Sequence, residues 1–192
     1  LVDKQRAGVQ VRLLRDSVGT MSTPQAFFDQ LAGAGVQVLE FNPMNPLAAH
    51  GNWALNQRDH RKLLIVDGHT AFLGGINISS VYSKGSASGA GRRDPTKAAA
   101  DPRIEWRDTD LQLQGPVVAE LQKIFLAAWA QQRGEPITGA GIFPPLKSIG
   151  TQVVRAIASS PTEPFSLIYA TLLSPIPRAA STTQPTTAYF AP

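Results

Sequence analysis

The sequence has 192 residues, of which 43% are hydrophobic and 17% charged, with 16 Gly, 15 Pro and no Cys. This composition argues against a collagen-like chain, a disulfide scaffold and a wholly disordered chain, and the length fits one domain and part of a second. The absence of Cys also excludes thiolate metal sites and fits a reducing compartment. The net charge of +4 favours anionic partners such as phospholipid, nucleotide or nucleic acid, but the Lys and Arg are spread along the chain and select none of them.

The pentapeptide Ala-Gly-Val-Gln-Val occurs twice, at residues 7–11 and 34–38. Each copy predicts the end of a helix, a glycine cap and the start of a strand. Between the copies, residues 22–24 predict a helix start with a side-chain cap and a first-turn proline, and three apolar residues follow at helical spacing (Phe27, Phe28 and Leu31). This order favours a mostly parallel sheet with helices on its faces, because parallel strands need a long crossover. We expect the first helix to begin before Leu1, so that the strand preceding it is missing.

Residues 63–66 form a continuous apolar run, which Asp67-Gly68-His69-Thr70 separates from the apolar residues 71–73. This pattern predicts two buried strands joined by a tight turn, in the middle of the sheet. The alternation at 111–113 predicts a further strand. Gly115-Pro116 then precedes a predicted core helix whose apolar residues share one face (Val117, Leu121, Ile124, Phe125 and Ala128).

Two segments without hydrophobic periodicity divide the chain. Residues 83–103 are rich in Ser, Gly, Ala, Lys and Arg and predict a long surface loop, whose basic residues either meet anionic headgroups or are simply solvated. The Gly- and Pro-rich residues 134–150 predict a linker between a first lobe, 1–133, and the start of a second, 151–192. In that second part, residues 168–180 predict a helix and 186–190 a strand.

A cluster of polar residues lies beside the predicted strand pair. His60 and Lys62 are two residues apart, so on a strand both side chains lie on the same face. Asn77 follows the second strand and can add an amide donor, while Gly74-Gly75 lets the backbone approach a ligand without a Cβ. The sequence therefore predicts an anion pocket that contains a nucleophile. Trp53, which lies in a polar segment before His60, is expected to line the substrate entrance.

The full pattern, His60-x-Lys62-x4-Asp67-x6-Gly74-Gly75-x-Asn77, resembles the signature of the phospholipase D superfamily. The surrounding residues 58–62, 106–109 and 115–118 are similar to its cardiolipin synthase and bacterial phospholipase D branch, over most of residues 1–133. The tail, 168–192, resembles the opening of that family's second lobe. The resemblance implies an α/β lobe with a mostly parallel mixed sheet flanked by helices, incomplete at both ends.

In this family, two such motifs, one from each lobe, meet at a single site. One His attacks phosphorus to form a phosphohistidine, while the other protonates the leaving alcohol and later activates the acceptor; neutral imidazole suits both tasks. The resemblance makes His60 a catalytic residue, gives phosphate binding to Lys62 and Asn77, and gives Asp67 a supporting role. Asp108 occupies the place of the acidic residue that orients a catalytic His. No metal or cofactor is implied.

These inferences imply phosphatidyl transfer or hydrolysis on anionic glycerophospholipids, in the cytoplasm or at a membrane surface of a bacterium. The second motif would come from a second lobe of a full-length chain or from a second copy, and we expect the present chain alone to be inactive. A nuclease that pairs one motif from each of two chains is an alternative, although the second-lobe tail argues against it and no nucleic-acid partner is expected. A third possibility is a non-catalytic module that uses the pocket only to bind anions.

Overall fold

The computed structural model describes residues 1–45, 57–78, 108–139, 141–159 and 165–182. The chain divides into two compact units, Leu1–Val154 and Arg155–Pro192, which are considered separately. The predicted loop at 83–103 and the predicted strand at 186–190 lie outside the described residues. Among the residues described, no helix has the length and apolar character needed to cross a membrane.

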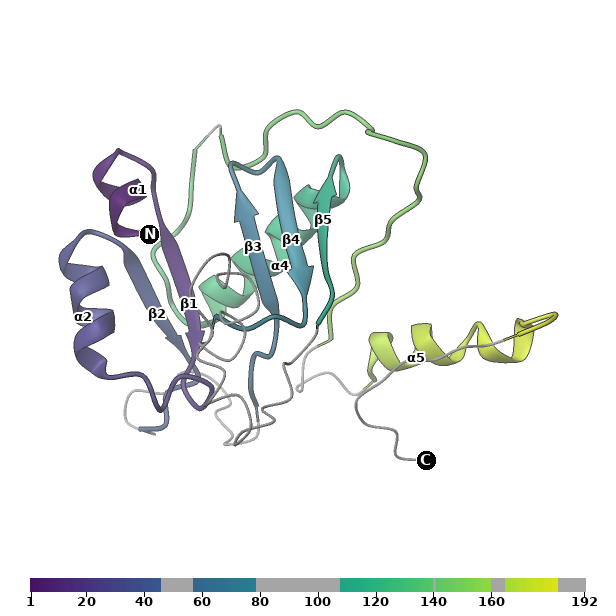
Figure 1. The fold of residues 1–192 in the computed structure, drawn as a ribbon, viewed down its shortest axis with the longest axis horizontal. Helices are drawn as coiled ribbons and strands as arrows, with labels where there is room; N and C mark the ends of the chain where they lie inside the picture. Colours follow the sequence, from purple (N-terminus) through teal and green to yellow (C-terminus); the bar gives the residue numbers. More distant parts are fainter. Residues whose placement is uncertain (46–56, 79–107, 140, 160–164, 183–192) are drawn as a thin grey trace, which may run out of the picture. The chain divides into compact units, whose positions relative to one another are not determined.

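The first unit begins with a helix–strand–helix–strand segment: α1 (Val2–Arg6), β1 (Arg12–Asp16), α2 (Gln25–Gly33) and β2 (Gln37–Phe41). Strands β1 and β2 are parallel, with Arg12 opposite Gln37 and Asp16 opposite Phe41. The repeated pentapeptide has the predicted conformation, since Gly8 (φ +88°) and Gly35 (φ +92°) both follow a helix in the left-handed region that glycine tolerates. This part of the sequence-based prediction is confirmed (Figure 1).

Helix α2 packs through one face only. Phe28 and Leu31 are buried together with Val36, and the half-buried Leu13 and Val38 of the strands, with Val11 just before β1, pack against them. Phe27, which was expected on the same face, is 49% exposed. The helix begins at Gln25 with Pro24 at its N-cap, and no side chain caps it, so the predicted Ser or Thr cap is wrong.

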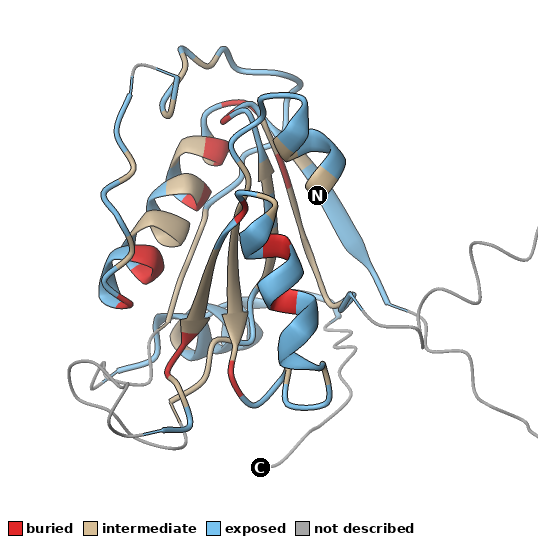
Figure 2. Cartoon of the chain, turned by 90° about the vertical axis from the view of Figure 1, so that its left-hand side faces the viewer, coloured by how far each residue is buried: buried red, intermediate tan, exposed pale blue. Residues whose placement is uncertain are grey.

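Three further strands form an antiparallel sheet in the order β3 (Lys62–Val66), β4 (Thr70–Gly74) and β5 (Asp110–Gln114). The expected tight turn joins β3 to β4, with left-handed backbone at Asp67 (φ +53°) and Gly68 (φ +65°), as an Asp-Gly hairpin turn prefers. Helix α4 (Val117–Gln131) contacts all three strands and buries Val118, Leu121, Ala128 and Trp129. Helices lie on both sides of the strands of this unit (Figure 2).

The sheet differs from the prediction in two respects. The described strands form two separate sheets, with one parallel and two antiparallel pairings, so a mostly parallel sheet is not confirmed. β3 is not buried on both sides either. Leu64 is 55% and Val66 42% exposed, whereas Ala71, on the opposite face of the sheet, is fully buried. A continuous apolar run predicts burial of both faces, but here only one face is covered by described residues.

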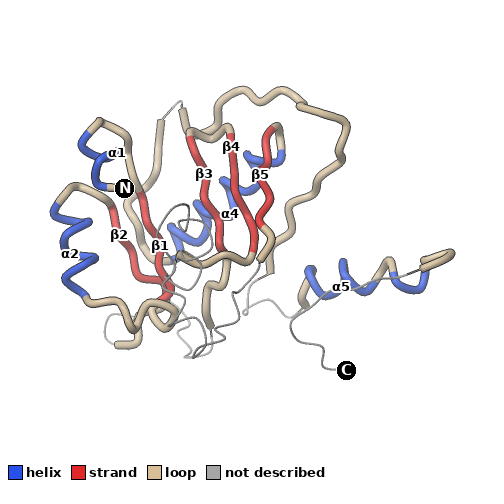
Figure 3. The backbone as a smooth tube through the Cα atoms, in the orientation of Figure 1, coloured by secondary structure: helices blue, strands red, loops and turns tan. Residues whose placement is uncertain are grey.

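After α4, the chain continues without helix or strand through the described residues up to Val154 (Figure 3). Trp129 holds the start of this segment by donating its Nε1–H to the Glu135 carbonyl at 3.0 Å. In the second unit, α5 (Leu167–Leu173) is followed by a 3-10 turn at Ile176–Arg178, and the Ser166 side chain accepts a hydrogen bond from the Tyr169 N–H at the start of α5. The predicted helix at 168–180 is therefore present, but it is interrupted.

Candidate active site

Strand register brings most of the predicted site residues to one edge of the three-stranded sheet. Lys62 at the start of β3 lies opposite Gly74 at the end of β4, and Gly74 lies opposite Asp110 at the start of β5. His60 precedes β3 by two residues, and Asn77 follows β4 by three. Both are exposed. The hairpin thus places an imidazole, an ammonium and an amide near the same edge.

The ammonium group of Lys62 is not neutralised by a carboxylate of the described residues. Its Nζ donates one hydrogen bond, to the His60 carbonyl at 2.7 Å. The remaining N–H groups are available to an anion beside His60. The His60 ring forms no hydrogen bond with any described residue, so its second nitrogen has no fixed partner here. Among the described residues, this edge therefore combines an ammonium that has no carboxylate partner with an exposed imidazole.

Because Gly74 and Gly75 have no side chain, residues 108–110 of the same chain can lie close to them. A Cβ on Gly75 would overlap the Asp108 carboxylate, and a Cβ on Gly74 would overlap Asp110 and the carbonyl of Thr109. The Gly75 N–H donates to the Thr109 carbonyl at 3.4 Å, and Asp110 accepts from the Ile76 N–H at 3.3 Å. The sequence predicts that a ligand approaches the backbone here, but residues 108–110 occupy this space.

Asp108 lies at this edge, but no described hydrogen bond or ion pair joins it to His60. Its carboxylate lies over Gly75 and accepts from the Thr109 N–H at 3.2 Å. No hydrogen bond joins it to the His60 ring, so the orienting role of Asp108 stays a prediction. Asp110 has no role predicted from the sequence; the β4–β5 register places it opposite Gly74, at the same edge.

Asp67 is separated from the other members of the motif. It lies in the β3–β4 turn, five residues after Lys62 and thus at the other end of β3, about 16 Å away at the usual rise of a strand. Its carbonyl contacts Nδ1 of His69 at 2.9 Å in the same turn. This location fits a structural role, because the turn fixes the hairpin that carries Lys62. Trp53 lies outside the described residues.

The residues that flank His60 are tied to each other. Arg61 forms an ion pair with Asp59 through two hydrogen bonds, Nε to Oδ1 at 2.8 Å and Nη2 to Oδ2 at 2.7 Å. The backbone N–H of Arg61 donates to the same carboxylate at 2.9 Å. The pair closes a small loop around His60 and balances the charge of Arg61. Of these neighbours of the imidazole, Lys62 is therefore the one without a carboxylate among the described residues.

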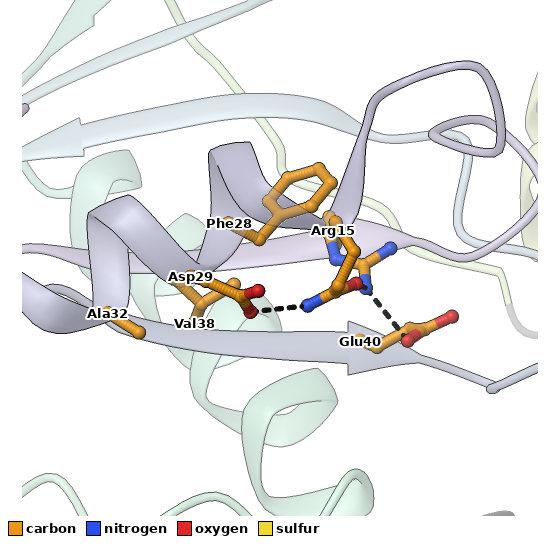
Figure 4. A pocket seen from close by; sticks show the side chains of 7 residues that line it. Arg15, Phe28, Asp29, Ala32, Val38 and Glu40 are labelled. Atoms are coloured by element: carbon orange, nitrogen blue, oxygen red, sulfur yellow. Dashed lines mark hydrogen bonds and ion pairs between the residues drawn. The ribbon is translucent and has the colours of Figure 1, made fainter.

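A hollow elsewhere in the unit contains none of the predicted site residues. It has a volume of about 250 Å³ and lies between α2 and the strands β1 and β2, where Arg15, Phe28 and Glu40 line it (Figure 4). Arg15 pairs with Glu40 at 2.8 Å and stacks 4.1 Å from the centre of the Phe28 ring. Because Glu40 already balances the charge of Arg15, Arg15 is not available in this hollow to bind an anion.

Metal ligation finds no support in the part of the chain that the structure describes. No group of three or more His, Asp or Glu residues in that part is arranged to hold a metal ion. The described functional groups at the sheet edge are one imidazole, one ammonium, one side-chain amide and two carboxylates. Of these groups, the Lys62 ammonium and the Asn77 amide suit the binding of an oxyanion by charge and hydrogen bonds, whereas the carboxylates would repel it.

Known relatives align with the whole chain, whereas a family model matches only its first part. A family model described as "Cardiolipin synthase, PLD-like domain" matches residues 1–84. The chain is 33% identical over 196 aligned residues to the cardiolipin synthase of Alkalihalophilus pseudofirmus, 32% over 198 to that of Halalkalibacterium halodurans and 33% over 196 to that of Geobacillus kaustophilus. Each alignment covers 100% of this chain but only 35%, 35% and 36% of the relative, so the chain spans about a third of their length. No solved structure matches it.

Proposed function

Because the chain belongs to the phospholipase D superfamily, in its cardiolipin synthase-like branch, we propose that it takes part in phosphatidyl transfer or hydrolysis on anionic glycerophospholipids. The observation that carries the proposal is the register that sets Lys62, without an acidic partner among the described residues, beside Gly74 at the edge where His60 is exposed. A phosphodiester carries one negative charge and two free oxygens, which suit an ammonium and neutral donors.

The proposed chemistry has two steps. In the first, an imidazole nitrogen attacks phosphorus, a P–N bond forms, and the P–O bond to the leaving alcohol breaks as a second imidazole gives that oxygen a proton. In the second, the acceptor hydroxyl loses its proton to the second imidazole and attacks phosphorus, and the P–N bond breaks. Transfer and hydrolysis differ only in whether the acceptor is an alcohol or water. His60 provides one of the two imidazoles.

Each residue at the edge has a distinct proposed role. Lys62 and Asn77 bind the phosphoryl oxygens, where charge increases as the transition state forms. Asp67 supports the hairpin from its other end, and Asp108 orients His60 in the working site. The second imidazole comes from a second motif, either in a further lobe or in a second copy of this chain. The protein acts at the membrane surface, where its lipid substrate lies.

Substitution of His60 tests the proposal. In an assembly with both motifs, supplied with phosphatidylglycerol in mixed micelles, His60→Ala should abolish turnover and phosphohistidine formation, because the group that forms or protonates the reacting bonds is gone. The matched control is His69→Ala, which removes an exposed imidazole from the β3–β4 turn and should leave the rate unchanged. Turnover close to wild type in His60→Ala would refute the assignment.

Lys62→Ala should leave the protein folded but lower turnover, with weaker binding of the phosphodiester. Electrostatic donors of this kind contribute about 3 to 4 kcal/mol to a transition state, which corresponds to roughly a 10²- to 10³-fold loss. Lipid binding that persists in the wild type without any phosphohistidine would instead favour the non-catalytic module. Cleavage of a nucleic acid in place of lipid would favour the nuclease.

A further inference from the structure

The position of His60 depends on the backbone that precedes β3, because no described residue holds its ring. The segment before β3 is held at three successive residues, at two of them through the backbone and at Arg58 through the side chain. The Gln57 carbonyl accepts from Nδ2 of Asn42 at 2.8 Å. Nη1 of Arg58 donates to the Asn42 carbonyl at 2.8 Å. The Asp59 N–H donates to Oδ2 of Asp16 at 3.2 Å.

These contacts converge on the ends of the two parallel strands. Asp16 ends β1, Asn42 directly follows β2, and Ser17 completes the group by donating its hydroxyl to the Asn42 carbonyl at 2.7 Å. Arg58 also reaches the Ser17 hydroxyl, at 2.5 Å. The segment that carries His60 is therefore anchored to a different sheet from the one in which Lys62 pairs.

Asn42 is the centre of this arrangement. It is only 4% exposed, and its backbone is left-handed (φ +50°), a conformation that Asn tolerates better than most residues. Its side-chain amide holds Gln57, and its carbonyl holds Ser17 and Arg58. A shift of the Asn42 backbone would therefore move residues 57 and 58 together.

The Asn42 backbone is in turn held by a residue from the far end of the unit. Its N–H donates to Oε1 of Gln132 at 3.0 Å, across 90 residues of sequence. Gln132 directly follows α4 and is 7% exposed. A buried polar side chain usually has a specific hydrogen-bonding task, because burial without a partner is unfavourable. Here its described task is to satisfy a buried N–H of a residue with unusual backbone conformation.

We propose that Gln132 is a positioning residue for His60 and acts through Asn42. This inference rests on the proposed function, because it assigns Gln132 to the catalytic His. α4 packs on the sheet that carries Lys62, while Asn42 follows the parallel pair. The Gln132–Asn42 hydrogen bond thus ties the two sheets together at the point from which the His60 segment extends, and sets the imidazole against Lys62.

Gln132→Leu tests this role, with Gln131→Leu as a matched control. Both variants make the same chemical change at the same helix end, but Gln131 is exposed. In Gln132→Leu the Asn42 N–H loses its acceptor. Amide exchange at Asn42 and Asp59 in the purified chain should then become about tenfold faster or more, while Gln131→Leu leaves it unchanged. Gln132→Glu keeps an acceptor oxygen and should restore slow exchange.

The second readout is kinetic and uses the assembly with both motifs. Misplacement of a catalytic group by about 1 Å can cost 10²-fold, so Gln132→Leu should lower kcat by about 10- to 100-fold with KM within about twofold. Gln132→Glu should restore kcat. If Gln132 only filled space, Glu and Leu at this position would lower kcat alike.

The outcomes separate the two proposals. Unchanged exchange at Asn42 and Asp59 in Gln132→Leu would overturn the positioning role, as would faster exchange with an unchanged kcat. A general loss of amide-exchange protection across β1 to β5, together with a lower Tm, would also overturn it. Gln132 would then only stabilise the fold as a whole. A wild-type assembly without phosphohistidine would overturn the proposed function, and the exchange comparison alone would then decide whether Gln132 holds the segment.

Discussion

Asp108 and Asp110 approach the same pair of glycines but hold different partners. Asp110 accepts from the Ile76 N–H after β4, whereas Asp108 accepts only from the neighbouring Thr109 N–H among the described residues. The Asp108 carboxylate is exposed and lies over Gly75. Since its hydrogen bond is local, a change of side-chain rotamer could bring it to another partner at low cost. This makes Asp108, rather than Asp110, the candidate to orient an imidazole.

Asp108→Asn should therefore slow turnover strongly and leave thermal stability nearly unchanged. An amide can stabilise the wrong imidazole tautomer, a change that costs about 10⁴-fold in a Ser-His-Asp enzyme, and we expect a loss of about 10²-fold here. The measurement is kcat in the assembly with both motifs, beside a thermal melt. Asp29→Asn, which alters an exposed carboxylate of α2, is the control. An unchanged kcat would show that Asp108 does not act on His60.

Some residues could be placed from the sequence because their patterns are local. The two glycines of the repeated pentapeptide predicted helix ends, and the apolar run at 63–66 predicted a strand whose start lies beside Gly74. The contacts of Gln132 could not be predicted in this way. A polar residue at the end of a helix shows no periodicity, and its partner Asn42 is 90 residues away. Asp110 was missed as a site neighbour because only the β4–β5 register places it beside Gly74.

At the scale of the strands, Gly74 controls how closely β4 and β5 approach. A Cβ at Gly74 would lie 2.6 Å from the Asp110 Cα and would also overlap the Thr109 carbonyl. These are backbone atoms, so the strands themselves would have to move apart. At Gly75 the three nearest atoms all belong to the Asp108 side chain, which can rotate away. The two adjacent glycines thus have different structural roles.

Gly74→Ala should accordingly destabilise the chain by about 1 to 3 kcal/mol, the usual range for overpacking. Gly33→Ala is the matched control, because Gly33 lies in α2 and a Cβ added to it would meet no described atom within 4 Å. A helical Gly→Ala change at an open position should instead stabilise the fold by about 0.5 to 1 kcal/mol. Denaturant melts of both variants measure these changes. Equal stability of Gly74→Ala and the wild type would mean that β5 does not pair with β4 as described.

In the whole chain, the sequence contains one His of the motif, whereas the proposed chemistry needs two imidazoles. It has three His residues and one His-x-Lys-x4-Asp sequence. His69 cannot serve as the second imidazole, because the β3–β4 turn places it at the opposite end of β3 from Lys62. His50 matches no position of the motif and lies outside the described residues. We therefore propose that the second group comes from another lobe or another copy.

The 192-residue chain alone should consequently show no turnover of a chromogenic phosphodiester, at any protein concentration, because attack on phosphorus and protonation of the leaving group need separate imidazoles. The measurement is a titration of protein concentration at fixed substrate, with His60→Ala as the blank. If two copies instead combine their His60 residues in a dimer, activity will rise with the square of protein concentration while most of the protein is still monomeric. This activity will be absent in His60→Ala. That result would show that the chain is active as a homodimer and contradict the prediction that it is inactive. His69→Ala should then show the same dependence on concentration as the wild type.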